Sequence, residues 1–523
     1  MRVITDRGLG QQLISSVLTT AALRHADREA LYCSGTGRRF TFRELNERSN
    51  RLAQSFSARG FRKGAVIGFL CPNRAEIVEI YFALAKTGII GLPLNYRLAA
   101  SEMAALLAAM GATGLVCDAR FAGVLELLRR DVPTLGEVIW IGNSPPARCV
   151  SYEALLAAAQ CTEPEVEIAE SDPHYFNLTS GTTGLPKAYV VSHYNNATLL
   201  GSMVAFGVAS EDVILTVFPA FGRVGFVWIA TALAFGLKTV LADFQAEEVL
   251  RLIDSERVTY TMLVPTMAAM LLASPELSRH SLASLRVVAY AGATLPQTIR
   301  EQSMACLCPN LYEGYGLQEA GWLTVSTAAD RARKPDSIGQ PVLFADVKII
   351  DAVGARLPPG QIGEIVARSP SGATSYFQSP VRSAEAFRNG WFHTGDLGRR
   401  DEDGYIYLCG RIKDMIISGG QNVHSAEIES TLLEIPGVKE CAVIGLPDDT
   451  WGERVAAVIV VDDSASLNLE SVREFCRPRI AGFKIPREVF TLVEPLPRTP
   501  TGKVQKFKLV ERYHPGNRYA RQL

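Results

Sequence analysis

From about residue 40 the chain alternates between short apolar segments of strand length and amphipathic segments of helix length. The segment 65–70 (Ala-Val-Ile-Gly-Phe-Leu) is a strand candidate, and the helical pattern of 75–86 follows it. The alternation continues through strand candidates at 89–94, 113–117, 175–178, 212–218, 239–242, 259–264 and 285–291, with a helix at 101–110. Strands joined by helices usually pair in parallel and carry helices on both faces. The pattern therefore predicts a large N-terminal domain of parallel-sheet α/β subdomains.

Beyond Val347 the pattern changes to short strands of the hairpin type, at 346–351, 363–368 and 404–408, with Asp403-Gly404 as a turn signal. A smaller α+β segment follows, with strands near 441–445 and 455–461 and a helix near 471–477. A chain of 523 residues is too long for one hydrophobic core. We therefore expect a β-rich subdomain that completes an N-terminal domain of residues 1–410, and a small mobile C-terminal domain of residues 411–523.

Composition excludes some classes of function. A net charge of −1 disfavours nucleic-acid binding by a basic surface. The sequence contains no run of about 20 apolar residues, so no membrane span is predicted. The basic N-terminus lacks the apolar segment of a secretory signal. The ten cysteines are scattered without the paired spacing of a zinc site, which is typical of packed thiols. We therefore expect a cytoplasmic protein.

The segment 178–187 (Leu-Thr-Ser-Gly-Thr-Thr-Gly-Leu-Pro-Lys) is the most informative part of the sequence. Its two glycines let backbone N–H groups turn toward one point, its hydroxyls add donors, and Lys187 adds a positive charge. This combination suits a polyphosphate, although it is not the Walker A pattern. The alternative is a flexible polar surface loop.

The segment 179–187 resembles the signature of the adenylate-forming superfamily, which includes acyl-CoA synthetases, adenylation domains of peptide synthetases and luciferases. Four further segments are similar to motifs of this superfamily and occur in the same order. They are Tyr-Gly-Leu-Gln-Glu at 315–319, Gly-Trp-Phe-His-Thr-Gly-Asp at 390–396, the hinge segment 410–420 and Pro-Arg-Thr-Pro-Thr-Gly-Lys at 497–503. The resemblance, strongest to the acyl-CoA synthetase branch, covers nearly the whole chain.

The resemblance implies a role for each matching residue in adenylation. Lys503 and Lys187 neutralise the charge where the acyl carboxylate meets the ATP phosphates, and Glu319 holds Mg²⁺ as a hard-oxygen ligand. Asp396 accepts hydrogen bonds from the ribose hydroxyls and Arg411 lies near ribose and phosphate, although a structural ion pair between these two is the alternative. The implied ATP/AMP-binding set is Thr179, Ser180, Gly181, Thr182, Thr183, Gly184, Lys187, Gly292, Ala293, Tyr315, Gly316, Gln318, Asp396 and Arg411.

The second half-reaction, transfer of the acyl group to coenzyme A, is implied to use the hinge segment. Lys413 stands at the hinge position, about which the C-terminal domain is expected to rotate. Gly419 and Gly420 have no side chains, so their backbone suits a narrow tunnel for the pantetheine arm. The CoA-binding set is Ser418, Gly419, Gly420, Lys484 and Arg487, although a charged turn explains the last two almost as well.

Three departures from the superfamily pattern affect these expectations. Ala188 follows Lys187 where a glycine is usual, and Gln318 replaces a threonine expected to contact the α-phosphate. Gly222 replaces a histidine that lies against the acyl group in many relatives, so we expect an enlarged acyl pocket. The expected acyl-pocket residues are Phe221, Gly222, Arg223, Val224, Tyr290, Gly314 and Gly321. Because these segments are mostly apolar, aromatic or small, they favour a bulky, cyclic, aromatic or fatty acid, with Arg223 as a candidate partner for a second carboxylate.

Together these features predict an ATP-dependent acid–thiol ligase that forms an acyl-adenylate and transfers the acyl group to coenzyme A, with release of AMP and pyrophosphate. A stand-alone adenylation enzyme that loads a carrier-protein thiol is the first alternative. A degenerate relative that binds ligand without turnover is the second alternative. The presence of Lys187, Glu319, Asp396, Arg411 and Lys503 argues against this last possibility.

Overall fold

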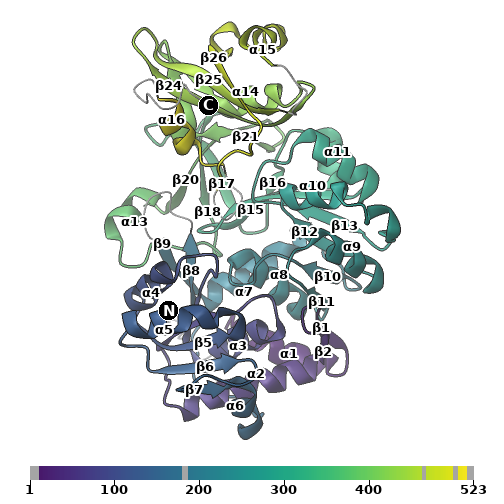
Figure 1. Ribbon diagram of the computed structural model, residues 1–523, viewed down its shortest axis with the longest axis vertical. Helices are drawn as coiled ribbons and strands as arrows, with labels where there is room; N and C mark the ends of the chain where they lie inside the picture. The colour runs from purple at the N-terminus through teal and green to yellow at the C-terminus, as the bar shows by residue number, and fades with distance from the viewer. Residues whose placement is uncertain (1–10, 180–186, 462–466, 499–503, 515–523) are drawn as a thin grey trace, which may run out of the picture. The chain divides into compact units, whose positions relative to one another are not determined.

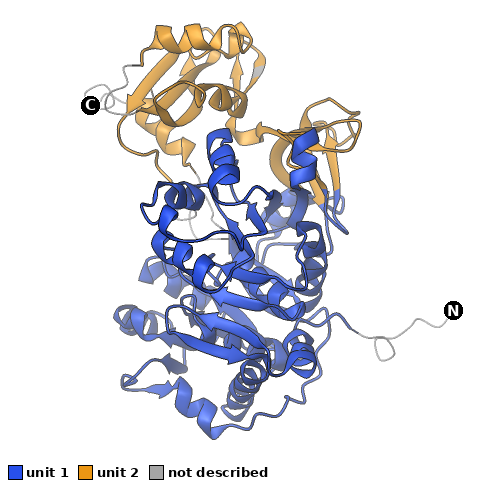
Figure 2. Cartoon of the chain, turned by 90° about the vertical axis from the view of Figure 1, so that its right-hand side faces the viewer, with its two compact units in different colours: residues 1–333, 341–346, 368–392 blue, residues 334–340, 347–367, 393–523 orange. Residues whose placement is uncertain are grey.

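The computed structural model describes residues 11–179, 187–461, 467–498 and 504–514 (Figure 1). The chain forms two compact units (Figure 2). Unit 1 comprises residues 1–333, 341–346 and 368–392, and unit 2 comprises residues 334–340, 347–367 and 393–523. Unit 2 thus takes in segments that the sequence analysis grouped with the N-terminal domain. A hinged division of the chain at 410–413 stays a prediction.

Unit 1 contains two large sheets. The seven-stranded sheet has the order β7-β6-β5-β3-β4-β8-β9, and all its neighbours are parallel except the pair β8–β9. Its strands are β3 (Val66–Leu70), β4 (Ile90–Pro93), β5 (Ala112–Asp118), β6 (Glu137–Ile141), β7 (Cys149–Ser151), β8 (Pro173–Thr179) and β9 (Lys187–Ser192).

The nine-stranded sheet has the order β16-β15-β14-β13-β12-β10-β11-β1-β2, with a parallel centre from β14 to β1. The strands β15 and β2 pair antiparallel with their neighbours β14 and β1. The strands are β1 (Glu29–Cys33), β2 (Arg38–Thr41), β10 (Val213–Thr216), β11 (Lys238–Leu241), β12 (Tyr260–Leu263), β13 (Val287–Tyr290), β14 (Leu311–Leu317), β15 (Gly321–Ser326) and β16 (Gln340–Pro341). The predicted parallel α/β architecture is therefore confirmed.

Helices connect and cover these sheets, as Figure 1 shows. Unit 1 contains α1 (Ser15–His25), α2 (Phe42–Ala58), α3 (Ala75–Thr87), α4 (Ala100–Ala109), α5 (Ala122–Asp131), α6 (Tyr152–Ala158), α7 (His193–Ser202), α8 (Arg223–Ala234), α9 (Ala246–Ser255), α10 (Pro265–Ala273), α11 (Gln297–Cys306), α12 (Ala328–Arg333) and α13 (Pro380–Ala386). Over the described residues, no helix has the length and apolar character needed to cross a membrane.

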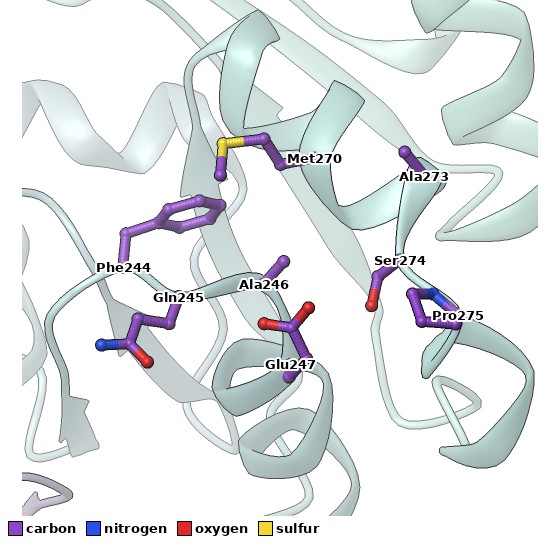
Figure 3. Close-up of a pocket in the computed structure, with 8 residues that line it drawn as sticks. All are labelled: Phe244, Gln245, Ala246, Glu247, Met270, Ala273, Ser274 and Pro275. Atoms are coloured by element: carbon purple, nitrogen blue, oxygen red, sulfur yellow. The ribbon is translucent and has the colours of Figure 1, made fainter.

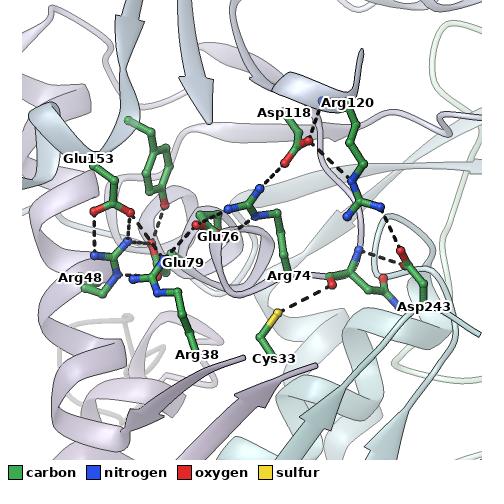
Figure 4. Close-up of polar contacts among 12 residues, drawn as sticks. Cys33, Arg38, Arg48, Arg74, Glu76, Glu79, Asp118, Arg120, Glu153 and Asp243 are labelled. Atoms are coloured by element: carbon green, nitrogen blue, oxygen red, sulfur yellow. Dashed lines mark hydrogen bonds and ion pairs between the residues drawn. The ribbon is translucent and has the colours of Figure 1, made fainter. Parts of the chain in front are cut away.

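Helix α3 is buried along its whole length, charged residues included. Figure 4 shows how its two carboxylates, Glu76 and Glu79, are paired. Glu79 accepts hydrogen bonds from Arg48 and from the Tyr152 hydroxyl, and Glu76 pairs with Arg74. A buried carboxylate is tolerated only when it is paired and hydrogen-bonded. The network therefore lets a charged helix lie in the interior of unit 1.

The strands β17 (Asp346–Ile350), β18 (Gly363–Arg368) and β20 (Trp391–Arg400), most of whose residues belong to unit 2, are consecutive in one sheet. The strand β21 (Ile406–Arg411) pairs with β20, and the short β19 (Phe387–Arg388), which belongs to unit 1, pairs with the first two residues of β20. A second sheet has the order β23-β22-β25-β24, with β26 beside β25. It contains β22 (Met415–Ser418), β23 (Gln421–His424), β24 (Val438–Asp448), β25 (Gly452–Val461) and β26 (Glu488–Leu492), with the helices α14 (Ser425–Leu432), α15 (Leu469–Cys476) and α16 (Lys506–Tyr513).

Candidate functional site

The two ends of the glycine- and hydroxyl-rich segment meet at an antiparallel pair of strands. Thr179, the last residue of β8, is opposite Lys187, the first residue of β9. The intervening site residues Ser180, Gly181, Thr182, Thr183 and Gly184 lie outside the described residues, and so does Lys503. The sheet edge thus fixes both ends of the segment.

Lys187, Tyr376 and Glu319 lie together in unit 1. The Lys187 ammonium is 4.8 Å from the centroid of the Tyr376 ring, a cation–π distance. The Tyr376 hydroxyl donates to Glu319 Oε1 at 2.9 Å. Burial, and then the Glu319 charge, raises the pKa of Tyr376, so the hydroxyl stays a donor. One tyrosine side chain therefore contacts an ammonium through its ring and a carboxylate through its hydroxyl.

Gln318, next to Glu319, is held by several groups. The Asn177 amide donates to Gln318 Oε1 at 2.9 Å and to the Tyr189 hydroxyl at 2.6 Å. The Tyr189 hydroxyl in turn donates to the Gln318 main-chain carbonyl. Because burial raises the pKa of Tyr189, this hydroxyl keeps its proton. The glutamine that departs from the superfamily pattern therefore has a fixed side-chain orientation.

Arg223, at the first position of α8, is a buried cation with an exposed fraction of 3%. Its Nη1 donates to the Gln318 carbonyl at 2.7 Å, and its Nη2 donates to the Ser371 carbonyl. Main-chain carbonyls therefore bind the two terminal nitrogens of this guanidinium, whereas Nε has no hydrogen-bond partner among the described residues. The pairing of Arg223 with a second carboxylate stays a prediction.

The residues before and inside α8 surround Gly222. The half-buried Phe221 packs its ring edge-on against Tyr96, with centroids 5.0 Å apart, and Val224 is half-buried. A Cβ added to Gly222 would approach only the Pro219 carbonyl, at 3.4 Å. Gly222 therefore has space on the side where its side chain would lie.

The remaining expected acyl-pocket residues have different surroundings. A Cβ on Gly314 would meet the Phe206 ring at 2.8 Å, and Gly321 has a φ of +75° with Ser371 close by. Tyr290 is fully buried and donates to Ser303 Oγ at 2.8 Å, and burial raises its pKa to about 12. Tyr290 belongs to a hydrophobic cluster with the β12 and α9 side chains, whereas Val224 packs against another cluster.

Four further nucleotide-site candidates belong to the nine-stranded sheet or to the segment that follows one of its strands. Gly292, with a φ of +87°, and the exposed Ala293 come directly after β13. Tyr315 and Gly316 lie in β14, and Tyr315 is opposite Thr324 of β15. A Cβ at Gly316 would collide with the Gly321 carbonyl at 2.3 Å, so this close strand pairing requires glycine.

In unit 2, Asp396 and Arg411 lie opposite each other on β20 and β21. Arg411 Nε donates to Asp396 Oδ1 at 2.6 Å, and Asp396 is 6% exposed. Thr394, two residues earlier, donates to the Ile365 carbonyl and accepts from the Asp396 N–H. The ion pair considered as the alternative for these residues is therefore present, and it orients the Asp396 carboxylate.

The candidate CoA-binding residues surround the β22–β23 turn. Gly419 and Gly420 have φ values of +58° and +74° and join the paired Ser418 and Gln421, a two-residue hairpin of the kind that favours glycine. Trp451 lies against Gly419 and carries the Arg487 guanidinium 4.2 Å from its ring centroid. Lys484 instead forms an ion pair with Glu427 at 2.7 Å, and Lys413 is exposed in the turn Ile412–Asp414.

Two pockets lie elsewhere in unit 1. The first, of about 420 Å³, lies at the start of α9 and the end of α10 and is lined by Phe244, Gln245, Ala246, Glu247, Met270, Ala273, Ser274 and Pro275 (Figure 3). The second, of about 470 Å³, includes Asn73, Arg74, Asp118, Arg120 and Asp243. Neither contains a residue assigned above to nucleotide, acyl group or CoA.

Sequence reasoning missed Tyr376, Tyr189 and Asn177. Asn177 and Tyr189 flank the 179–187 segment at strand positions that face one another, since Asn177 is opposite Tyr189 in the β8–β9 register. A polar residue within the run Tyr175–Leu178, whose other members are aromatic or apolar, was the available signal for Asn177. Tyr376 follows a Ser- and Gly-rich segment, and only the fold brings it to Glu319.

The fold matches that of adenylate-forming enzymes. The AMP-binding enzyme family matches residues 18–377, and the AMP-binding enzyme C-terminal domain matches residues 427–503. The chain belongs to this family, and with it to the adenylate-forming superfamily. Its relatives identify the acyl-CoA synthetase branch.

Several known proteins are similar over most of the chain. The long-chain-fatty-acid–CoA ligase FadD13 of Mycobacterium tuberculosis is 35% identical, over 91% of this chain and 93% of its own. Feruloyl-CoA synthase of an Amycolatopsis species is 34% identical, over 91% and 94%. The fatty acid–[acyl-carrier-protein] ligase ScoC of Streptomyces coeruleorubidus is 32% identical, over 97% and 98%. The ATP-bound structure of MatB from Rhodopseudomonas palustris has a TM-score of 0.86 and 29% identity, over 95% and 99%.

Proposed function

We propose that this protein is an AMP-forming acid–thiol ligase, which activates a carboxylic acid as its acyl-adenylate and transfers the acyl group to coenzyme A. The observation that carries the proposal is the contact chain from Lys187 through Tyr376 to Glu319. It lies beside the paired ends of the glycine- and hydroxyl-rich segment, in a chain that belongs to the AMP-binding enzyme family.

Adenylation needs positive charge, because the acyl carboxylate and the α-phosphate of ATP are both anions. Lys187 supplies one cation at the end of the phosphate-binding segment, and we assign Lys503 as the second. The acyl oxygen attacks the α-phosphorus, the bond to the β-phosphate oxygen breaks, and pyrophosphate leaves with the electron pair. A cation aimed at developing charge contributes about 3–4 kcal/mol to such a step.

Mg²⁺ fits the residues present. Glu319 offers a hard carboxylate oxygen, and the described residues contain no cluster of three or more His, Cys, Asp or Glu side chains arranged to hold a metal ion. Magnesium in nucleotide sites is typically held by one or two carboxylates together with substrate phosphates. The ion, when bound, neutralises phosphate charge, and Tyr376 keeps the Glu319 carboxylate turned for this contact.

The remaining assignments follow the family motifs. Asp396, oriented by Arg411, accepts from the ribose hydroxyls, and Tyr315 lies against the adenine. Ser418, Gly419 and Gly420 form the path of the pantetheine arm, and Arg487, close to Trp451, meets CoA phosphate. The CoA thiol then attacks the acyl carbon, and AMP leaves.

The space at Gly222 and the aromatic Phe221 support a bulky, cyclic, aromatic or fatty acid. The relatives named for long-chain fatty acids and for ferulic acid support the same classes. All ten cysteines are free thiols, which supports a reducing compartment such as the cytoplasm.

The test is to incubate the protein with ATP, Mg²⁺ and a panel of fatty, aromatic and cyclic acids, with and without CoA. We expect pyrophosphate release with some acids, and acyl-CoA only when CoA is present. Absence of pyrophosphate with every acid would contradict adenylation. Pyrophosphate release without acyl-CoA, together with acylation of a carrier protein, would favour the carrier-protein alternative, which similarity to ScoC supports.

A further inference from the structure

The Arg223 guanidinium is buried among main-chain carbonyls of unit 1. It is 3% exposed and donates to the carbonyls of Gln318 and Ser371, with the Tyr189 hydroxyl at 3.5 Å from Nη1. Over the described residues, no carboxylate forms an ion pair with it. Because a buried cation is costly without partners, a guanidinium retained here has to be bound by the dipoles around it. The two terminal nitrogens of Arg223 therefore join these segments, whereas its Nε has no hydrogen-bond partner among the described residues.

The two carbonyls come from segments distant in the sequence. Gln318 lies just beyond β14, and Ser371 lies in the segment 369–377, which runs alongside it. The Ala373 N–H donates to the Glu319 carbonyl at 2.7 Å, and Ser371 Oγ donates to the Ala320 carbonyl at 3.3 Å. The same segment carries Tyr376, whose hydroxyl holds the Glu319 carboxylate. Arg223 thus fastens together the two segments that position Glu319.

We infer that Arg223 is a positioning residue for the nucleotide: by holding the Gln318 and Ser371 carbonyls, it fixes the Gln318-Glu319 pair for Mg²⁺ and phosphate. The inference rests on the function proposed above. It gives Gln318 a role as well. Because Oε1 accepts from Asn177, the amide Nε2 is the atom left to donate to a phosphate oxygen, as the threonine of relatives is expected to do. Arg223 and Asn177 hold the main chain and the side chain of the same residue.

Arginine suits this position better than lysine. A planar guanidinium presents several N–H groups in a fixed fork and can bind two acceptors at once, whereas an ammonium is a compact point charge on a flexible stem. Arg223→Lys therefore keeps the charge but cannot bind both carbonyls in one geometry. It is the most selective substitution for testing the positioning role.

The matched control is Arg331→Lys. Arg331 is a second buried arginine of unit 1, 7% exposed, and its Nη1 donates to Glu313 at 3.2 Å. Arg331 and its partner Glu313 have no role in the proposed chemistry. The control reports what the loss of a buried guanidinium does to the fold alone.

The measurement is the calorimetric Kd of an ATP analogue with a non-hydrolysable α–β bridge, with Mg²⁺ and with EDTA, beside the Tm of each variant. We expect Arg223→Lys to raise the Kd with Mg²⁺ about tenfold, a change of about 1.4 kcal/mol in binding free energy. The variant should also reduce the difference in affinity between the measurements with Mg²⁺ and with EDTA. Arg331→Lys is expected to lower the Tm about as much as Arg223→Lys does. It should leave the Kd within about twofold of wild type.

An unchanged Kd in folded Arg223→Lys would overturn the inference, and so would an effect confined to the KM of the carboxylic acid. If that variant does not fold, Tyr189→Phe removes another donor to the Gln318 carbonyl. It should raise the Kd about threefold, and an unchanged value would again overturn the inference. A wild-type protein that neither binds the analogue nor releases pyrophosphate would instead refute the proposed function.

Discussion

The Tyr376 hydroxyl lies 2.9 Å from Glu319 Oε1. The ring of the same side chain contacts Lys187, whose ammonium lies 4.8 Å from the ring centroid. One tyrosine therefore contacts both a cation and an anion of the proposed nucleotide site. Its hydroxyl is polar and its ring face is electron-rich, so each partner meets the part of the side chain that attracts it.

Tyr376→Phe tests the hydroxyl without removing the ring. A hydrogen bond to a charged group is worth about 1.5–3 kcal/mol, so we expect the apparent affinity for ATP with Mg²⁺ to fall at least about tenfold. The check is the KM for ATP in a pyrophosphate-release assay. Tyr152→Phe is the matched control, because its hydroxyl also donates to a buried carboxylate, Glu79 Oε2 at 2.7 Å, within the α3 network. Equal effects of the two substitutions on the KM would contradict the assignment.

Lys503→Ala should separate the two half-reactions. Lys503 lies in the Pro-Thr-Gly-Lys segment assigned to adenylation, where loss of a cation aimed at developing charge slows the step about 100- to 1,000-fold. Thioester formation from chemically prepared acyl-adenylate should be largely unaffected. The measurement is acyl-CoA formation from acid plus ATP compared with formation from the acyl-adenylate. An equal loss in both assays would contradict the expectation that the C-terminal domain rotates between the two half-reactions.

Lys413→Pro should have the reverse effect. Proline fixes φ near −65° and limits the backbone rotation expected at this exposed position. We expect pyrophosphate release to persist and thioester formation to drop about tenfold or more. Single-turnover assays of each half-reaction measure this directly, with Lys413→Ala as the control that keeps backbone freedom. Normal thioester formation in the proline variant would remove the hinge assignment.

The strands of the parallel sheets were predictable because apolar runs and helical patterns are local. The expected strand at 65–70 is β3 at Val66–Leu70, and the expected helix at 75–86 is α3 at Ala75–Thr87. Contacts at the site were harder to predict. Tyr376 and Glu319 are 57 residues apart, and Arg223 and Gln318 are 95 apart. Such pairs depend on how the sheets and the 369–377 segment pack, which no local pattern encodes.

A buried pair of histidines predicts how the stability of unit 1 depends on pH. His174 and His193 have ring centroids 5.5 Å apart, and burial lowers the pKa of His174 to about 3 and that of His193 to about 4. Both are neutral in the folded protein, whereas the unfolded chain binds their protons below a pKa of about 6.5. Stability is therefore full above pH 6.5 and falls as the pH drops toward 4, by about 1.4 kcal/mol per pH unit for each histidine.

The check on this prediction is urea unfolding at pH 7.5 and pH 5. His193→Phe keeps a ring but removes one titrating group, so the loss of stability between the two pH values should shrink by about 2 kcal/mol. His280→Gln is the control, because its ring is only half-buried beside Asp254. An unchanged pH dependence in His193→Phe would show that the folded protein does not keep this histidine neutral.

Gly222→His tests whether the missing side chain at the start of α8 enlarges the acyl pocket. A Cβ at this position meets only the Pro219 carbonyl at 3.4 Å, and the residue has a φ of −91°, so histidine fits the backbone without strain. An imidazole would fill the space next to Phe221, and interiors tolerate overlaps of a few methylenes only at a cost of about 1–3 kcal/mol. We therefore expect the KM for bulky acids to rise about tenfold or more, with the KM for short acids within about twofold.

Gly222→Ala is the control, since one methyl group leaves most of the space open. Equal effects of histidine on large and small acids would mean that Gly222 does not line the acyl pocket, and that Phe221 or another neighbour closes the gap.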